Sequence, residues 1–122
     1  MSLVTLTIIL AGLGSLVTLT LAVKFLRDPE RGMAWATHEL EHLPQVMADR
    51  YFAMTFLALG AAVYGDLKVI AYLFAVFAFI GTYDAVIYAR AGKPMIKHLA
   101  SGVASIVVMV VALLALNSGV NA

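Results

Sequence analysis

An uncharged run of 22 residues, Ser2 to Val23, constrains the fold of this chain more than any other feature. A helix of about 20 residues is needed to cross a hydrocarbon core roughly 30 Å thick. Hydrophobic residues make up 63% of the 122 residues and charged residues 12%, against about 45–50% and about 25% in soluble domains. A soluble domain of this size could not bury so much apolar surface. The sequence therefore predicts an integral membrane protein, with the lipid bilayer as a partner.

Net charge and cysteine content exclude several classes of function. A formal net charge of +1 provides no broad basic surface, so we expect no nucleic-acid partner. The chain has no cysteine, which excludes disulfides, thiolate zinc sites, iron–sulfur clusters and cysteine nucleophiles.

Three further apolar segments follow the first. The uncharged stretch 51–65 has only 15 residues, about 22 Å as a helix, so this span must begin earlier, just after Pro44. Tight connections between the spans are predicted at Gly65-Asp66 and at Ala91-Gly92-Lys93-Pro94, because glycine ends helices and proline can begin them. The expected spans are about 2–23, 45–65, 69–89 and 96–117. They predict an all-α, four-helix up-down bundle forming one membrane domain, 1–122.

The basic residues predict the orientation of the bundle, because cytoplasmic loops of membrane proteins are enriched in Lys and Arg. Of the eight basic residues, only Lys68 lies on one side. The other seven lie opposite: Lys24, Arg27, Arg31, Arg50, Arg90, Lys93 and Lys97. Both termini are therefore expected outside and the first and third connections in the cytoplasm, and we expect the bacterial inner membrane as the location.

The first connection is expected to contain a short helix of its own, at about 29–43. Asp28-Pro29-Glu30 is typical of a helix start, with Asp28 as the cap and Pro29 at the first position. Charged residues alternate with apolar ones along the segment, and Trp35 is a typical interface anchor. This pattern predicts an amphipathic helix lying on the cytoplasmic face of the membrane.

Polar residues of three spans are expected to meet near the cytoplasmic end. Asp84 lies 15 residues after Val69, and Arg50 lies 15 residues before Gly65. At about 1.5 Å per residue, both lie about 22 Å from the same outer connection, so an Arg50–Asp84 pair is geometrically natural. His98 begins the fourth span near that level. Tyr88 lies one turn after Asp84, and Ser101 continues the face of His98.

This polar cluster allows two interpretations. A buried Arg–Asp pair can simply fix the register of two helices. Ionisable groups at membrane depth also mark functional sites. In that case the cluster forms a pocket for a small lipophilic ligand, in which Asp84 or His98 would exchange a proton and Arg50 would hold a carbonyl or carboxylate. Tyr88 and Ser101 would line the ligand. Whether the protein is an enzyme stays open.

Two alternatives remain beside the ligand pocket. The protein could be a non-enzymatic accessory or assembly subunit of a larger membrane complex, or a homo-oligomer, that uses its helix faces. It could also bind a metal, because the segment His38-Glu39-Leu40-Glu41-His42 fits the pattern H-E-x-x-H. On a helix, His38 and His42 would share a face and could bind Zn²⁺. A third ligand is then needed, and His98 and Asp84 are the attractive candidates. Otherwise both histidines belong to the polar face of the interfacial helix.

Short motifs along the last three spans give a resemblance to a known family. They are Ala48-Asp49-Arg50-Tyr51, Leu57-Ala58-Leu59-Gly60, Gly65-Asp66, Asp84-Ala85, and His98-Leu99 with Gly102. From about Ala48 to Leu116 the chain resembles the small four-helix membrane proteins of domain of unknown function family 4267, within the DoxX-like group. The resemblance implies four spans with an Arg, an Asp and a His on successive helices, and it implies no activity. The segment 25–47 departs from the pattern.

Overall fold

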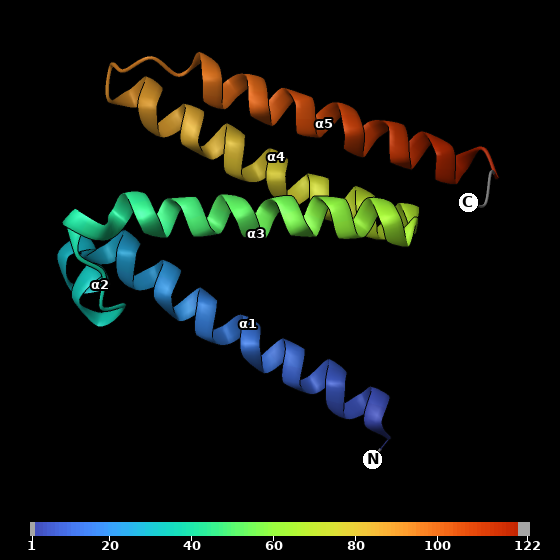
Figure 1. The fold of residues 1–122 in the computed structure, drawn as a ribbon, viewed down its shortest axis with the longest axis horizontal. Helices are drawn as coiled ribbons and strands as arrows, with labels where there is room; N and C mark the ends of the chain where they lie inside the picture. The colour runs from blue at the N-terminus through green and yellow to red at the C-terminus, as the bar shows by residue number, and fades with distance from the viewer. Residues whose placement is uncertain (1, 120–122) are drawn as a thin grey trace. The chain divides into compact units, whose positions relative to one another are not determined.

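The computed structural model of the protein describes residues 2–119, and over that range the chain forms only helices and the turns between them (Figure 1). This confirms the all-α class. The elements in chain order are α1 (Leu3–Arg27), α2 (Pro29–Trp35), the short 3₁₀ helix η1 (Leu40–His42), α3 (Leu43–Tyr64), α4 (Leu67–Arg90) and α5 (Ile96–Asn117). Residues 1 and 120–122 of the expected domain lie outside the described residues. The chain divides into two compact units, an N-terminal unit up to Asp49 and a C-terminal unit from Arg50 onward.

Within residues 2–119, four helices are long and apolar enough to cross a membrane. They are α1, α3, α4 and α5, each within a few residues of its expected bounds. The largest difference is that α1 continues past Val23 to Arg27. Lys24 and Arg27 lie in its last turn, where positive charge interacts favourably with the helix dipole. The four candidate spans indicate a membrane protein, while the up-down arrangement and the sidedness stay predictions.

The helices α4 and α5 pack against each other through small residues. The buried residues of α4 are Ala71, Ala78, Gly81 and Ala85, and those of α5 are Gly102 and Ala112. At Gly81 the two backbones nearly touch, because an added Cβ would lie 2.6 Å from the backbone nitrogen of Gly102. Small residues of this kind allow close helix packing in membranes, where larger side chains face lipid.

The joint between α1 and α2 depends on a single residue, Asp28. Its backbone N–H donates to the carbonyl of Lys24 at 2.9 Å, which completes the end of α1. Its carboxylate accepts from the backbone N–H of Arg31 at 3.1 Å, which caps the start of α2. Pro29 occupies the first turn of α2, where it costs no hydrogen bond. The helix start expected at Asp28-Pro29-Glu30 is therefore confirmed, and its position at the membrane interface stays a prediction.

The second helix is shorter than the sequence predicts, because it ends at Trp35 instead of continuing to about residue 43. Thr37 adopts a φ of 56°, the left-handed conformation that commonly follows a helix end. The N–H of Thr37 donates to the carbonyl of Ala34 at 3.1 Å, and that of His38 donates to Met33 at 2.9 Å. This bond pattern is a Schellman motif, usually formed with glycine. The sequence has threonine instead of glycine at this position, so the residue pattern did not indicate that α2 ends at Trp35.

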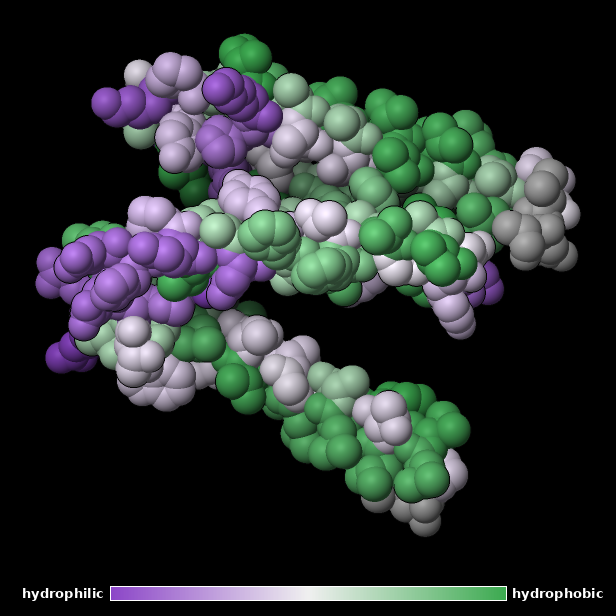
Figure 2. All heavy atoms as spheres, viewed as in Figure 1, coloured by the Kyte–Doolittle hydropathy of each residue, from purple (hydrophilic) through white to green (hydrophobic). Residues whose placement is uncertain are grey.

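Apolar and polar residues separate along the individual helices. On the face drawn in Figure 2, hydrophobic residues cover most of α1 and α5, and hydrophilic residues gather around α2 and at the connection between α4 and α5. No residue of α1 is buried. Helices that contact lipid are expected to be apolar and exposed along their middle part and polar at their ends.

Candidate functional site

The connected ends of α4 and α5 bring an acid and a histidine together. Asp84 lies less than two turns before the end of α4, and His98 lies in the first turn of α5. The Oδ2 atom of Asp84 is 3.7 Å from Nδ1 of His98. This distance is within ion-pair range but too long for a hydrogen bond. Both side chains are partly exposed, at 39% for Asp84 and 30% for His98.

An aromatic ring covers one face of the His98 imidazole. Tyr88, one turn after Asp84, stacks on His98 with ring centroids 4.5 Å apart and an angle of 24° between the planes. The stacked ring and the carboxylate together restrict how the imidazole can turn. Asp84, Tyr88 and His98 therefore form one cluster, which helical spacing and antiparallel depth predicted.

The turn between the two helices sets the register of this cluster. Gly92 has a φ of 65°, and the N–H of Lys93 donates to the carbonyl of Tyr88 at 2.9 Å. The second bond of this Schellman motif joins Gly92 to Ala89 at 3.1 Å. The glycine allows α4 to end within one residue, so α5 can begin at Ile96 and return along α4.

The other two residues of the predicted cluster, Ser101 and Arg50, lie on α5 and α3. Ser101, one turn after His98, lies beside α4: its Oγ would be 2.8 Å from a Cβ added at Gly81. Gly81 is one turn before Asp84, so Ser101 is one layer further along the same helix pair. Arg50 lies on α3 with an exposed side chain. Its pairing with Asp84 stays a prediction.

This arrangement is suited to moving a proton or holding a polar group. With Nδ1 directed at a carboxylate, the other ring nitrogen, Nε2, is the one left for a ligand, because the partner of one nitrogen decides the role of the second. The phenol of Tyr88 can both donate and accept a hydrogen bond. Contacts of this kind are often long before a ligand binds. The cluster can therefore orient an imidazole toward a carbonyl or carboxylate group.

The segment with the H-E-x-x-H pattern has a different structure from the expected helix. His38 and Glu39 precede η1, and His42 ends it, so the argument that His38 and His42 share a face of an α-helix is wrong. Nε2 of His42 lies 3.8 Å from Oε2 of Glu39. In the described part of the chain, no three His, Asp or Glu side chains gather as metal ligands. The expected Zn²⁺ site at His38, His42 and His98 has no support in this geometry.

One group of residues was not foreseen from the sequence. Lys24, Arg27 and Arg31 line a hollow at the joint of α1 and α2, together with Trp35. In the sequence, the three cations indicate the sidedness of the membrane, and Arg31 also belongs to the charged residues of the expected amphipathic helix. Their positions in the sequence gave no sign that they line one hollow, because the joint at Asp28 sets the direction in which α2 leaves the end of α1.

The fold and the cluster define a broad class of protein, and no family is assigned to the chain. Four candidate spans among residues 2–119 indicate a helical membrane protein with a polar cluster at one end of a helix pair. Comparison with known proteins finds no matching family model, no matching curated protein and no matching solved structure. Membership of family 4267 or of the DoxX-like group stays a prediction.

Proposed function

We propose that the protein binds, or acts on, a small lipophilic ligand at the cluster of Asp84, Tyr88 and His98, with Arg50 and Ser101 at its edge. The observation that carries this proposal is the 3.7 Å approach of Asp84 to His98 on two predominantly apolar helices. Ionisable side chains are costly at membrane depth, and those that occur there usually serve a function.

The residues have distinct roles in this proposal. Asp84 orients the imidazole of His98, whose Nε2 accepts or donates a proton at the ligand. Tyr88 holds the ring in place by stacking and offers its hydroxyl group to the ligand. Arg50 binds a carbonyl or carboxylate of the ligand. The cluster faces the cytoplasm in the orientation that the basic residues predict.

A lipophilic ligand fits the surroundings of the cluster. The helices on either side of it expose large apolar side chains, among them Ile80 and Val86 on α4 and Leu99 on α5. A molecule with an apolar body and one polar end can lie along these side chains and place its polar end at His98. A fully water-soluble substrate would gain nothing from the apolar side chains.

The proposal is tested by the molecules that copurify with the protein. The full chain would be purified in mild detergent, extracted with organic solvent, and the extract analysed by mass spectrometry. We expect one lipophilic species at a constant ratio to polypeptide in the wild type and its loss in His98→Ala. The matched control is His38→Ala, which removes a histidine from the N-terminal unit and keeps the species.

Two results would contradict the proposal. The first is an extract that holds only the bulk lipids of the source membrane, in the same proportions for wild type and His98→Ala. The second is a specific species retained equally by both histidine variants. The second result would favour the alternative in which the helix faces, and not the polar cluster, carry the function of an accessory subunit.

A further inference from the structure

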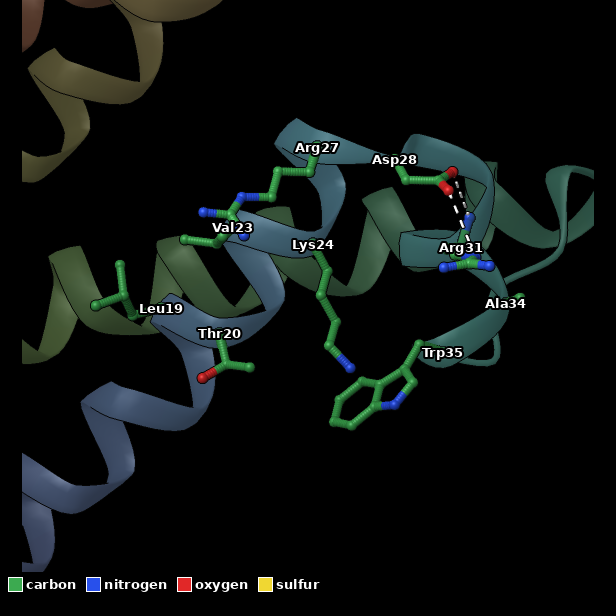
Figure 3. Close-up of a pocket in the computed structure, with 9 residues that line it drawn as sticks. All are labelled: Leu19, Thr20, Val23, Lys24, Arg27, Asp28, Arg31, Ala34 and Trp35. Carbon is green, nitrogen blue, oxygen red and sulfur yellow. Dashed lines mark hydrogen bonds and ion pairs between the residues drawn. The ribbon is translucent and has the colours of Figure 1, made fainter.

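A second feature lies in the N-terminal unit, at the joint of α1 and α2. A hollow of about 920 Å³ opens there between the last turns of α1 and the short helix α2. Figure 3 shows the residues that line it. They are Leu19, Thr20, Val23, Lys24, Arg27, Asp28, Arg31, Ala34 and Trp35. The lining shares no residue with the cluster of Asp84, Tyr88 and His98.

The lining of the hollow is apolar in one part and cationic in the other. The uncharged part of α1 contributes Leu19 and Val23 to the lining. The last turn of α1 contributes Lys24 and Arg27. Arg31 adds a third cation from α2, and Asp28 is the only acid in the lining. The carboxylate of Asp28 is 3.6 Å from Nε of Arg31. Two positive charges therefore remain uncompensated within the lining.

Trp35 holds one of these cations in position. The Nζ atom of Lys24 lies 3.5 Å from the centroid of the Trp35 ring, a cation–π contact that limits the freedom of the lysine. Figure 3 shows Lys24 reaching from α1 toward this ring. Trp35 as a whole is 58% exposed. An exposed tryptophan beside a fixed cation is typical of the membrane interface, where Trp rings lie at headgroup level.

The position of the hollow along α1 points to the membrane surface. The uncharged part of α1 ends at Val23, so Lys24 and Arg27 mark the level at which a spanning helix leaves the hydrocarbon. At that level the hollow would meet headgroups on its cationic side and acyl chains beside Leu19 and Val23. Clusters of basic residues at the end of a membrane helix attract anionic lipids.

We propose that the joint of α1 and α2 is a binding site for one anionic phospholipid. Lys24, Arg27 and Arg31 hold the headgroup phosphate, and an acyl chain lies against Leu19 and Val23. Arg27 and Arg31 offer guanidinium groups, which bind phosphate oxygens in pairs. The charge of the lining matches an anion, and its apolar part matches a lipid better than a free phosphate ion.

The chain contains its own reporter for this site, because Trp35 is its only tryptophan. The full chain would be reconstituted in phosphatidylcholine vesicles that contain a small fraction of brominated lipid, which quenches tryptophan on contact. We expect brominated phosphatidylglycerol to quench Trp35 at least about threefold more than brominated phosphatidylcholine at equal fraction, since each basic residue near the surface favours anionic lipid.

Variants separate this site from a general effect of charge. Arg27→Gln/Arg31→Gln should abolish the preference for phosphatidylglycerol. The side chain of Arg31 is 89% exposed, so its replacement leaves packing intact. Arg90→Gln/Lys93→Gln removes the same charge from the C-terminal unit and should keep the full preference. Asp28→Asn should increase the preference, because asparagine still caps α2 while the only acid in the lining is lost.

Three outcomes would overturn the proposal. Equal quenching by the two brominated lipids would show that no anionic lipid is selected. An equal loss in the Arg90→Gln/Lys93→Gln control would assign the preference to overall charge. Full displacement of the quencher by millimolar inorganic phosphate would assign the site to a soluble anion instead of a lipid.

Discussion

The two units of the chain are stabilised in different ways. In the C-terminal unit, α4 and α5 pack along buried glycine and alanine, with Gly81 against Gly102. In the N-terminal unit no residue of α1 is buried, and α2 is fixed to the end of α1 by a cap and a turn. The one buried residue of α2 is Gly32, where an added Cβ would lie 2.9 Å from the ring of Phe25.

Close packing therefore stabilises the pair of α4 and α5, whereas hydrogen bonds between residues near in sequence stabilise the joint of α1 and α2. A helix pair with backbones in contact depends on the absence of side chains at a few positions. A joint such as that at Asp28 depends on hydrogen bonds between neighbours in the chain. We therefore expect the largest loss of stability where a larger side chain is introduced between α4 and α5, and smaller changes where a substitution alters the backbone preference at a helix end.

The largest effect is expected for Gly81→Ala. Its new Cβ would lie 2.6 Å from the nitrogen and 2.8 Å from the Cα of Gly102, and backbone atoms cannot move aside as a flexible side chain can. We expect a loss of about 3 kcal/mol or more, the upper part of the range for overpacked sites. Unfolding in detergent, followed by circular dichroism, measures it.

The matched control is Gly60→Ala on α3. No atom lies within 4 Å of a Cβ added there, so the new methyl group meets nothing. Alanine is favoured over glycine in a helix by up to about 1 kcal/mol, and a small gain in stability is expected. If Gly60→Ala and Gly81→Ala were equally harmful, the close approach of α4 and α5 at Gly81 would not be the cause of the loss.

A smaller effect, of opposite sign in the two units, is expected where helices end on a residue with positive φ. Thr37→Gly relieves a β-branched residue at 56°, and we expect a gain of about 0.5–1 kcal/mol after the extra freedom of glycine in the unfolded chain is counted. Gly92→Ala places a side chain at 65° and should cost about 1–2 kcal/mol. Chemical denaturation of both variants measures this difference, and a loss of stability in Thr37→Gly would contradict the account of the turn.

Much of the fold follows from the distribution of charge along the sequence. The span expected at 96–117 coincides with α5, and the other three expected spans differ from α1, α3 and α4 by a few residues. Uncharged runs identify such helices because hydrocarbon tolerates little charge. The end of α2 could not be predicted in the same way. It depends on Thr37 in a conformation for which threonine gives no sequence signal.

The candidate site was predictable in part, for a similar reason. Asp84 and Tyr88 share a helix face by spacing, and the short connection at Gly92 returns His98 to their level. The hollow at the first joint was missed, because the contact of Lys24 with Trp35 crosses a break between two helices. Helical spacing places residues within a helix, whereas the angle between helices depends on caps such as Asp28.

The smallest effect on stability, and the largest on function, is expected for Asp84→Asn. The carboxylate is 39% exposed, and ion pairs of such exposure contribute about 0–1 kcal/mol. A register-fixing role would predict the reverse: Asp84→Asn would lose stability, and the double variant Arg50→Leu/Asp84→Leu would recover it.

The central claim is therefore tested most directly by the amount of lipophilic ligand bound per polypeptide in Asp84→Asn protein. Wild-type and variant samples would be compared at the same folded fraction, with the ligand quantified by mass spectrometry after solvent extraction. We predict a folded Asp84→Asn protein that has lost the ligand found in the wild type. A folded Asp84→Asn protein with the same ligand content as the wild type would contradict the account.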